Sequence, residues 1–116
     1  MTTQKRQSPG FALSSQEELV LAALRGRERY GLEILKAIEE ASGGKRKLGF
    51  GSLYPTLHKL EREGLVKSRW GEDRPEERGG ARRRYYQITG LGERALREAG
   101  QLRADLATWQ PAWGRV

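Results

Sequence analysis

Six side chains between residues 52 and 62 have the chemistry that binding to a nucleic acid needs. Hydroxyl groups at Ser52 and Thr56 can donate to phosphate oxygens, and His58 can contact a base edge or a phosphate. Tyr54 combines a phenol that can reach a phosphate with a ring that fits a sugar or a thymine methyl; its alternative is a half-buried place in the core. Two cations complete the series: Lys59 and Arg62.

A second basic group lies some twenty residues later in the chain. Arg82 and Arg83 open a strand pattern just after a loop that contains Gly and Pro, where arginines can enter a minor groove or bridge its phosphates. Arg84 falls on one strand face and is expected to pack inward or to pair with a carboxylate. Lys47, the last of three consecutive basic residues in a loop, is a further candidate for DNA contact; solvated charge is its alternative.

Few residues in the sequence have the types and spacing that a catalytic site needs. There is no cysteine, which excludes thiolate metal sites and disulfides, and a single histidine cannot build a histidine metal cluster. The acidic residues come in charge-patterned stretches, without a sign of the buried, facing carboxylates that acid–base chemistry would use. Residues 49–51 lack the Lys-Ser/Thr of a phosphate-binding loop. We expect no enzyme, no metal site and no cofactor.

The charge balance points to a polyanionic partner. The net charge is +7 and the pI about 10.1, and residues 45–84 hold twelve Lys and Arg against six Asp and Glu. Such a local excess of positive charge favours a nucleic acid as the partner, and an anionic membrane surface as the second choice. The alternative is a charged surface that is only solvated. No apolar run approaches the length of a membrane span and no signal peptide is evident, so we expect a cytoplasmic protein without membrane contact.

Hydrophobic periodicity and chain breakers predict how these side chains are positioned. The expected order is α-α-α-β-β-α, a mainly α (α+β) winged helix-turn-helix fold. The first helix is predicted to start at a capping box formed by residues 15–18 and to end at Gly26. The second helix is predicted to start at Tyr30 or Gly31 and to end near residue 41 or 42, before two glycines.

The third predicted helix, about residues 52–63, carries the polar series. Pro55 is placed in its first turn, Gly64 closes it, and three leucines share its inner face. Strands at 65–70 and 82–88 then form a wing of about residues 66–88. We expect the helix to enter a major groove and the wing to lie on flanking phosphates or a minor groove.

A seam of apolar residues runs along the last predicted helix, from about Gly90 to Trp109. Its spacing of three and four resembles a coiled coil and predicts a homodimer; an intramolecular stripe is the alternative. The predicted interface comprises Leu19 of the first helix with Leu91, Ala95, Ala99, Leu102, Leu106 and Trp109. Two-fold symmetry would match a pseudo-palindromic DNA site.

The expected organisation of the 116 residues is one domain with tails. Residues 1–13 are predicted to be a flexible tail, 14–89 the DNA-binding domain, 90–110 the dimerisation helix and 111–116 a second tail. Trp109 and Trp113 lie four residues apart near the expected dimer axis, where aromatic rings can form a slot for a small, flat aromatic effector. The alternative is that both tryptophans close the dimer core.

Together these motifs resemble the PadR family of bacterial transcriptional regulators over about residues 15–106. The resemblance rests on Tyr30-Gly31, Gly51-Ser52-Leu53-Tyr54-Pro55-Thr56-Leu57, Leu60-Glu61, Glu63-Gly64-Leu65, Arg83-Arg84-Tyr85-Tyr86, Ile88-Thr89 and Gly92.

The resemblance implies a winged-helix homodimer, usually a repressor, of the short subgroup with one C-terminal helix. Some members of that subgroup bind aromatic or drug-like effectors between the subunits. In the family, the position of Tyr54 and the basic residues of the wing are associated with DNA contact. This chain departs from the pattern in its wing tip, residues 71–80, which carries four acids. That departure keeps a second hypothesis open, a winged-helix protein-interaction module with little specific DNA binding.

Overall fold

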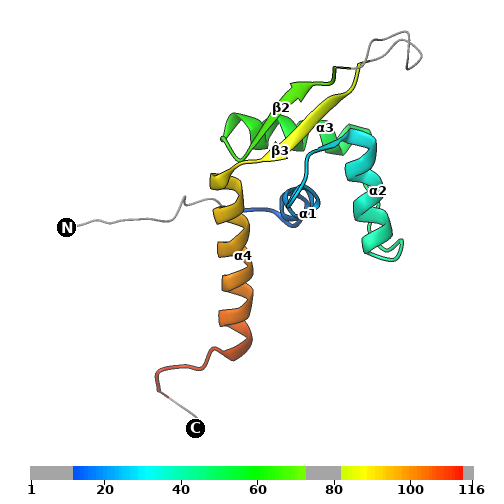
Figure 1. The fold of residues 1–116 in the computed structure, drawn as a ribbon. Coiled ribbons are helices and arrows are strands. Elements are labelled where there is room, and N and C mark those ends of the chain that lie inside the picture. The colour runs from blue at the N-terminus through cyan, green and yellow to red at the C-terminus, as the bar shows by residue number, and fades with distance from the viewer. Residues whose placement is uncertain (1–11, 73–81, 114–116) are drawn as a thin grey trace, which may run out of the picture.

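The computed structural model describes residues 12–72 and 82–113, which form four helices and a three-stranded antiparallel sheet (Figure 1). The elements in chain order are α1 (Ser15–Ala23), β1 (Arg29–Tyr30), α2 (Gly31–Ala41), α3 (Phe50–Arg62), β2 (Val66–Trp70), β3 (Arg84–Ile88) and α4 (Gly90–Thr108). This confirms the predicted winged helix-turn-helix fold, with β1 as an added element. Residues 1–11 of the predicted first tail, the last three residues and most of the predicted wing tip lie outside the described residues, whereas Leu13 at the end of that tail packs against the core.

The sheet has the strand order β1-β3-β2. In the hairpin, Val66 pairs with Ile88 and Trp70 with Arg84, so paired side chains share a face. On the other edge of β3, Tyr30 pairs with Tyr85. Strand β1 was not predicted, because two residues are too few for an alternating pattern to be visible.

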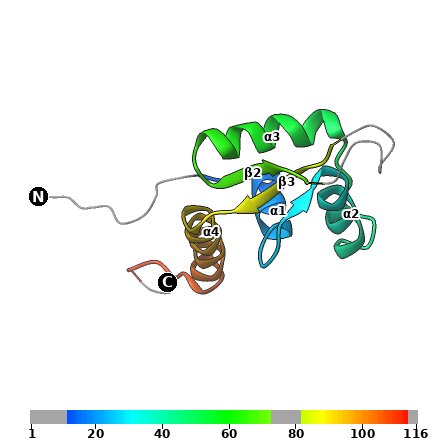
Figure 2. The ribbon, with the colours of Figure 1, turned by 45° about the horizontal axis from the view of Figure 1, so that its top comes forward.

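One hydrophobic core joins all the helices to the hairpin. The inner face of α3 contributes Leu53, Leu57 and Leu60, each fully buried, as their spacing predicts. Figure 2 shows α3 lying along one side of the hairpin, with α1 beneath the sheet and α4 leaving from its end. The remaining buried apolar residues are Val20, Leu21, Leu24, Ile34, Ile38, Leu65, Val66, Tyr86, Ile88 and Ala95.

The start of α1 differs from the prediction by one residue. The capping box is formed by Ser14 and Glu17, and not by Ser15 and Glu18: the Ser14 hydroxyl accepts from the Glu17 N–H at 3.1 Å, and the Glu17 carboxylate accepts from the Ser14 N–H at 2.9 Å. Both pairs have the required spacing, so local pattern cannot separate them. The observed register buries the Glu17 side chain against α3, whereas Glu18 pairs with Arg103 of α4.

The start of α3 also differs from the prediction. The helix begins at Phe50 with Gly49 as its N-cap, so Pro55 lies in the second turn and not in the first. Pro55 has no N–H to donate, so it removes one hydrogen bond from inside the helix. At the other end Gly64 has a φ of 79°, and Leu65 N–H donates to the Leu60 carbonyl at 2.9 Å, which forms a Schellman motif.

The turn at the end of α3 also positions the start of α4. The Thr89 hydroxyl donates to the Gly64 carbonyl at 2.6 Å and accepts from the Gly92 N–H at 3.0 Å, so it caps α4 while holding the turn. A side chain at Gly92 would collide with the carbonyl oxygen of Leu65. Gly92 therefore permits close packing of α4 on the strand that follows α3.

The seam on α4 divides into two parts. Ala95 is 2 % exposed and lies in the chain's own core, and Leu91 packs against that core, so Ala95 is not available to a second chain. Further along, Leu102, Leu106 and Trp109 are each about 60 % exposed, where α4 projects from the body of the domain (Figure 1). No helix in the described residues is long and apolar enough to cross a membrane.

Candidate nucleic-acid interface

The outer face of α3 presents polar and aromatic side chains to solvent. Tyr54, His58 and Arg62 are exposed on this face because the leucines of the same helix are buried. The Tyr54 ring stacks on Phe50, with ring centroids 5.7 Å apart and planes 13° apart. At 36 % exposure, Tyr54 is held by neighbours yet keeps an accessible edge. Its geometry therefore combines the two alternatives that the sequence left open.

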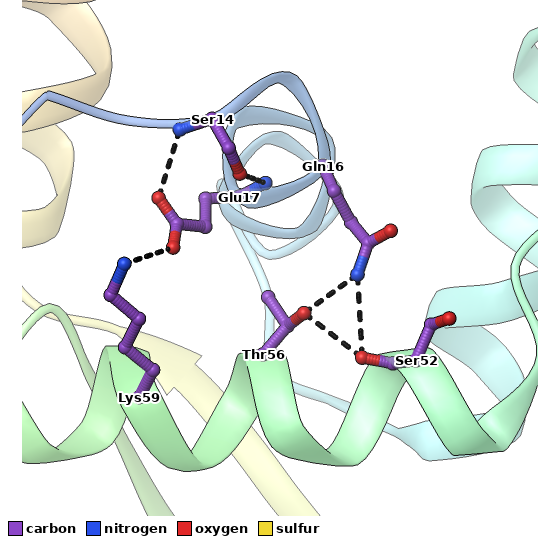
Figure 3. A network of polar contacts seen from close by, with 6 residues as sticks. All are labelled: Ser14, Gln16, Glu17, Ser52, Thr56 and Lys59. Atoms are coloured by element: carbon purple, nitrogen blue, oxygen red, sulfur yellow. Dashed lines mark hydrogen bonds and ion pairs between the residues drawn. The ribbon is translucent and has the colours of Figure 1, made fainter.

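The opposite flank of α3 is tied to α1 by a polar network (Figure 3). Gln16 Nε2 donates to Thr56 Oγ1 at 2.7 Å and to the Ser52 carbonyl at 3.3 Å. One turn further along α3, Lys59 Nζ lies 2.9 Å from Glu17 Oε2. Two of the side chains predicted to contact DNA, Thr56 and Lys59, thus face α1 in the free protein. In this arrangement, Thr56 and Lys59 fix the position of α3 relative to α1.

Glu17 and Lys59 stabilise each other's charged forms. Burial raises the pKa of the Glu17 carboxyl, but the bonds from Lys59 and from Ser14 outweigh burial and hold the pKa below its ordinary value. The hydrogen bond to Glu17 in turn raises the pKa of the Lys59 ammonium group. Both groups are therefore charged at neutral pH, where the ion pair links α1 to α3.

The arginines at the base of the wing lie against aromatic rings. The guanidinium carbon of Arg84 is 4.9 Å from the centre of the Trp70 ring, and that of Arg82 is 5.4 Å from the same ring. Arg83 lies over Tyr30, at 4.2 Å. Arg82 and Arg83, predicted as neighbours on DNA, therefore contact different sides of the hairpin, because successive side chains of a strand alternate between its faces.

The remaining basic candidates are peripheral. Lys47 lies in the exposed loop between α2 and α3, with its Nζ 3.8 Å from Glu39 Oε2, a distance at which an exposed pair contributes little. Arg74 and Arg78 of the wing tip lie outside the described residues. Among the residues that the structure describes, no three His, Cys, Asp or Glu side chains are grouped so as to hold a metal ion.

Four residues that shape this face were not predicted from the sequence. Gln16 and Glu17 bind α3 to α1, and Phe50 stacks on Tyr54. The ring of Trp70 makes cation–π contacts with Arg82 and Arg84. Only the Trp70 contact had a usable signal, since Trp70 and Arg84 occupy the strand ends that a hairpin brings together. The contacts of Gln16 and Glu17 depend on how α1 crosses α3, which no local pattern encodes.

Comparison with known proteins supports this interpretation of the surface. Residues 20–98 match the family described as "Transcriptional regulator PadR-like family". A PadR-like transcription factor from Bacteroides fragilis is 28 % identical, with a TM-score of 0.68 over 79 % of this chain and 82 % of that chain. A PadR family regulator from Eggerthella lenta is 30 % identical, with a TM-score of 0.67 over 80 % of this chain and 75 % of that chain. An uncharacterized protein from Lysinibacillus sphaericus is 27 % identical over 82 residues, which are 71 % of this chain and 72 % of the relative.

The helix-turn-helix, its basic hairpin and these likenesses define a DNA-binding winged-helix transcriptional regulator. The chain belongs to the PadR-like family, as its sequence motifs led us to expect. The family is non-enzymatic, which agrees with the lack of catalytic residues in the sequence.

Proposed function

We propose that this chain is a sequence-specific, homodimeric repressor that binds a pseudo-palindromic DNA site in the cytoplasm. The recognition helix α3 (Phe50–Arg62) enters the major groove, and the wing, about residues 66–88, lies on flanking phosphates or in a minor groove. The observation that carries the proposal is the outer face of α3, where Tyr54, His58 and Arg62 are exposed beside the arginines of the hairpin.

The contacts fall into two groups by their chemistry. His58, Arg62 and Tyr54 are placed to reach bases and the backbone from α3, while Arg82 and Arg83 reach phosphates from the wing. Ser52, at the exposed start of α3, adds a hydroxyl to the helix N-terminus, which favours a phosphate. Lys47 contributes long-range attraction, and Thr56 and Lys59 hold the helix that carries the other groups.

The dimer is proposed to form through the exposed part of the α4 seam. This part of the seam exposes three large apolar side chains to water: Leu102, Leu106 and Trp109. Burying them against a second copy is favourable by roughly 25 cal/mol per Å² of apolar surface. Leu19 and Ala99, which are half-buried, border this surface in the proposal. Trp113, at 75 % exposure, and Trp109 are the proposed walls of an effector slot between the subunits.

Fluorescence anisotropy tests the proposal with labelled DNA from upstream of the chain's own gene. The control is a shuffled duplex of equal length, with both titrated at two salt concentrations. We expect tighter binding to the native fragment and a steep loss of affinity with salt, because phosphate contacts release counterions. His58→Ala is expected to reduce the preference for the native fragment, whereas Arg97→Gln on α4 serves as a control for charge loss.

Each result points to a definite conclusion. Equal and weak binding to both duplexes would reject a sequence-specific regulator of that promoter and would favour the protein-interaction alternative. Transcription from the bound fragment in a purified system then decides the sign of regulation: a drop on adding the protein supports repression, and a rise contradicts it.

A further inference from the structure

Trp70 has an unusual environment for an exposed tryptophan. It ends β2 with 49 % of its surface exposed, and two guanidinium groups, those of Arg82 and Arg84, lie within cation–π range of its ring. The two positive charges at one ring repel each other, and their attraction to the negative faces of the ring offsets only part of this repulsion. A compact anion beside both groups would offset the rest, so the cluster is suited to an anionic ligand.

A hollow of about 520 Å³ opens beside this cluster, between the hairpin and α3. The hairpin lines it with Trp70, Arg82 and Arg84, and α3 lines it with Tyr54 and His58. Glu61 also lines the hollow, and its carboxylate accepts a hydrogen bond from the Ser68 hydroxyl at 2.7 Å. Two arginines against one carboxylate leave the hollow with a positive balance.

The hollow lies where a DNA backbone must pass if the proposed function is right. With α3 in a major groove and the wing over the adjacent minor groove, the sugar-phosphate strand between the two grooves crosses the gap between helix and hairpin. That gap is the hollow lined by Trp70 and the two arginines. The fork of donors on a guanidinium matches the oxygens of a phosphate and allows two parallel hydrogen bonds.

We propose that this hollow binds a phosphate of duplex DNA through Arg82 and Arg84. Trp70 is the positioning residue, whose ring holds both guanidinium groups beside the hollow. The proposal rests on the proposed function, because it needs α3 and the wing on the same duplex. It adds Trp70 and Arg84 to the interface and gives Arg82 a defined partner. A planar ring beneath the guanidinium groups restricts their rotation, which reduces the entropy lost when the phosphate binds.

Salt-dependent anisotropy titrations with full-length variants test the hollow, on both the native and the shuffled duplex. Arg84→Gln is expected to weaken binding about tenfold on both duplexes and to lower the slope of log K against log salt by about 0.9, since one phosphate contact is lost. Trp70→Leu removes the ring and is expected to weaken binding severalfold, whereas Trp70→Phe retains a ring and restores part of the affinity.

Arg97→Gln removes the same charge from α4 and should leave the slope unchanged, and circular dichroism establishes that every variant is folded. If the wild-type chain binds duplex DNA but Arg84→Gln and Trp70→Leu keep its affinity and slope, the hollow is not a phosphate site. A loss confined to the native duplex would assign the arginines to bases and would also overturn the proposal. If the wild-type chain binds neither duplex, the proposed function itself fails.

Discussion

The hydroxyl group of Tyr54, on the recognition helix, lies against the backbone of Gly31, at the start of α2. A Cβ atom built on Gly31 would overlap the Tyr54 hydroxyl oxygen and would lie 3.1 Å from Tyr54 Cζ. Gly31 is the first residue of α2 and is buried, so the contact joins the two helices of the helix-turn-helix. The contact explains physically why position 31 is a glycine in a chain with a tyrosine at position 54.

The contact between Tyr54 and Gly31 predicts the effect of a single methyl group. Gly31→Ala should lower the free energy of unfolding by about 1–3 kcal/mol, as overpacking of a tight site does. In a Tyr54→Phe background the same change should cost less, because the colliding oxygen is gone. Chemical denaturation of the four proteins measures both effects as a double-mutant cycle.

Gly51→Ala is the matched control, since nothing lies within 4 Å of a Cβ built there. This substitution in α3 should be neutral or should stabilise the chain by about 0.5–1 kcal/mol. Equal costs for Gly31→Ala in the wild-type chain and in the Tyr54→Phe variant would show that the hydroxyl contact is not the cause.

The ion pair between Glu17 and Lys59 predicts a dependence of stability on pH. The pKa of the Glu17 carboxyl lies below its ordinary value of 4.5, so the stability it contributes is fully present above pH 4.5 and is lost as the pH falls through the lower pKa of the folded chain. Glu17→Gln should therefore lower the Tm at pH 7, and the difference from wild type should shrink at pH 3. Thermal unfolding between pH 3 and 7 measures this, and a constant difference would contradict it.

The exposed part of the α4 seam predicts how the assembly responds to charge. Leu102→Glu should convert the proposed dimer to monomer, because it places a carboxylate in an apolar contact. Ala107→Glu adds the same charge to the same helix about 140° away from Leu102, and should leave the dimer intact. Light scattering coupled to size-exclusion chromatography gives the mass. A monomeric wild-type chain, or a dimer that survives Leu102→Glu, would reject the seam.

The proposed effector slot predicts a saturable optical response. Planar aromatic compounds should quench tryptophan fluorescence, and Trp109→Ala should abolish the saturable part of the quenching. Strand β2, which ends at Trp70, lies away from the far end of α4 (Figure 1), so Trp70 contributes to the background that remains. Quenching that is unchanged in Trp109→Ala, or that never saturates, would place the interaction elsewhere.

The sequence by itself determined the four helices, the two strands of the hairpin and the inner face of α3. The spacing of Leu53, Leu57 and Leu60 fixed which side of α3 is buried, because a helical period leaves one choice once the apolar residues are known. Gly64 and Thr89 marked a helix end and a helix start for equally local reasons. Boundaries were less secure: two capping boxes were possible at the start of α1, and burial of Glu17 against α3 separated them.

Only the tertiary structure decided what the polar side chains touch. Helical spacing gives the angle of Lys59 around α3, but Glu17 reaches it only because α1 crosses α3 at that turn. Likewise, the hairpin register brings Arg84 onto Trp70, and β1 places Tyr30 under Arg83. Apolar periodicity is a local property of the chain, so it can be read from sequence. Polar partners come from segments distant in the sequence, and their contacts exist only once packing has fixed how those segments meet.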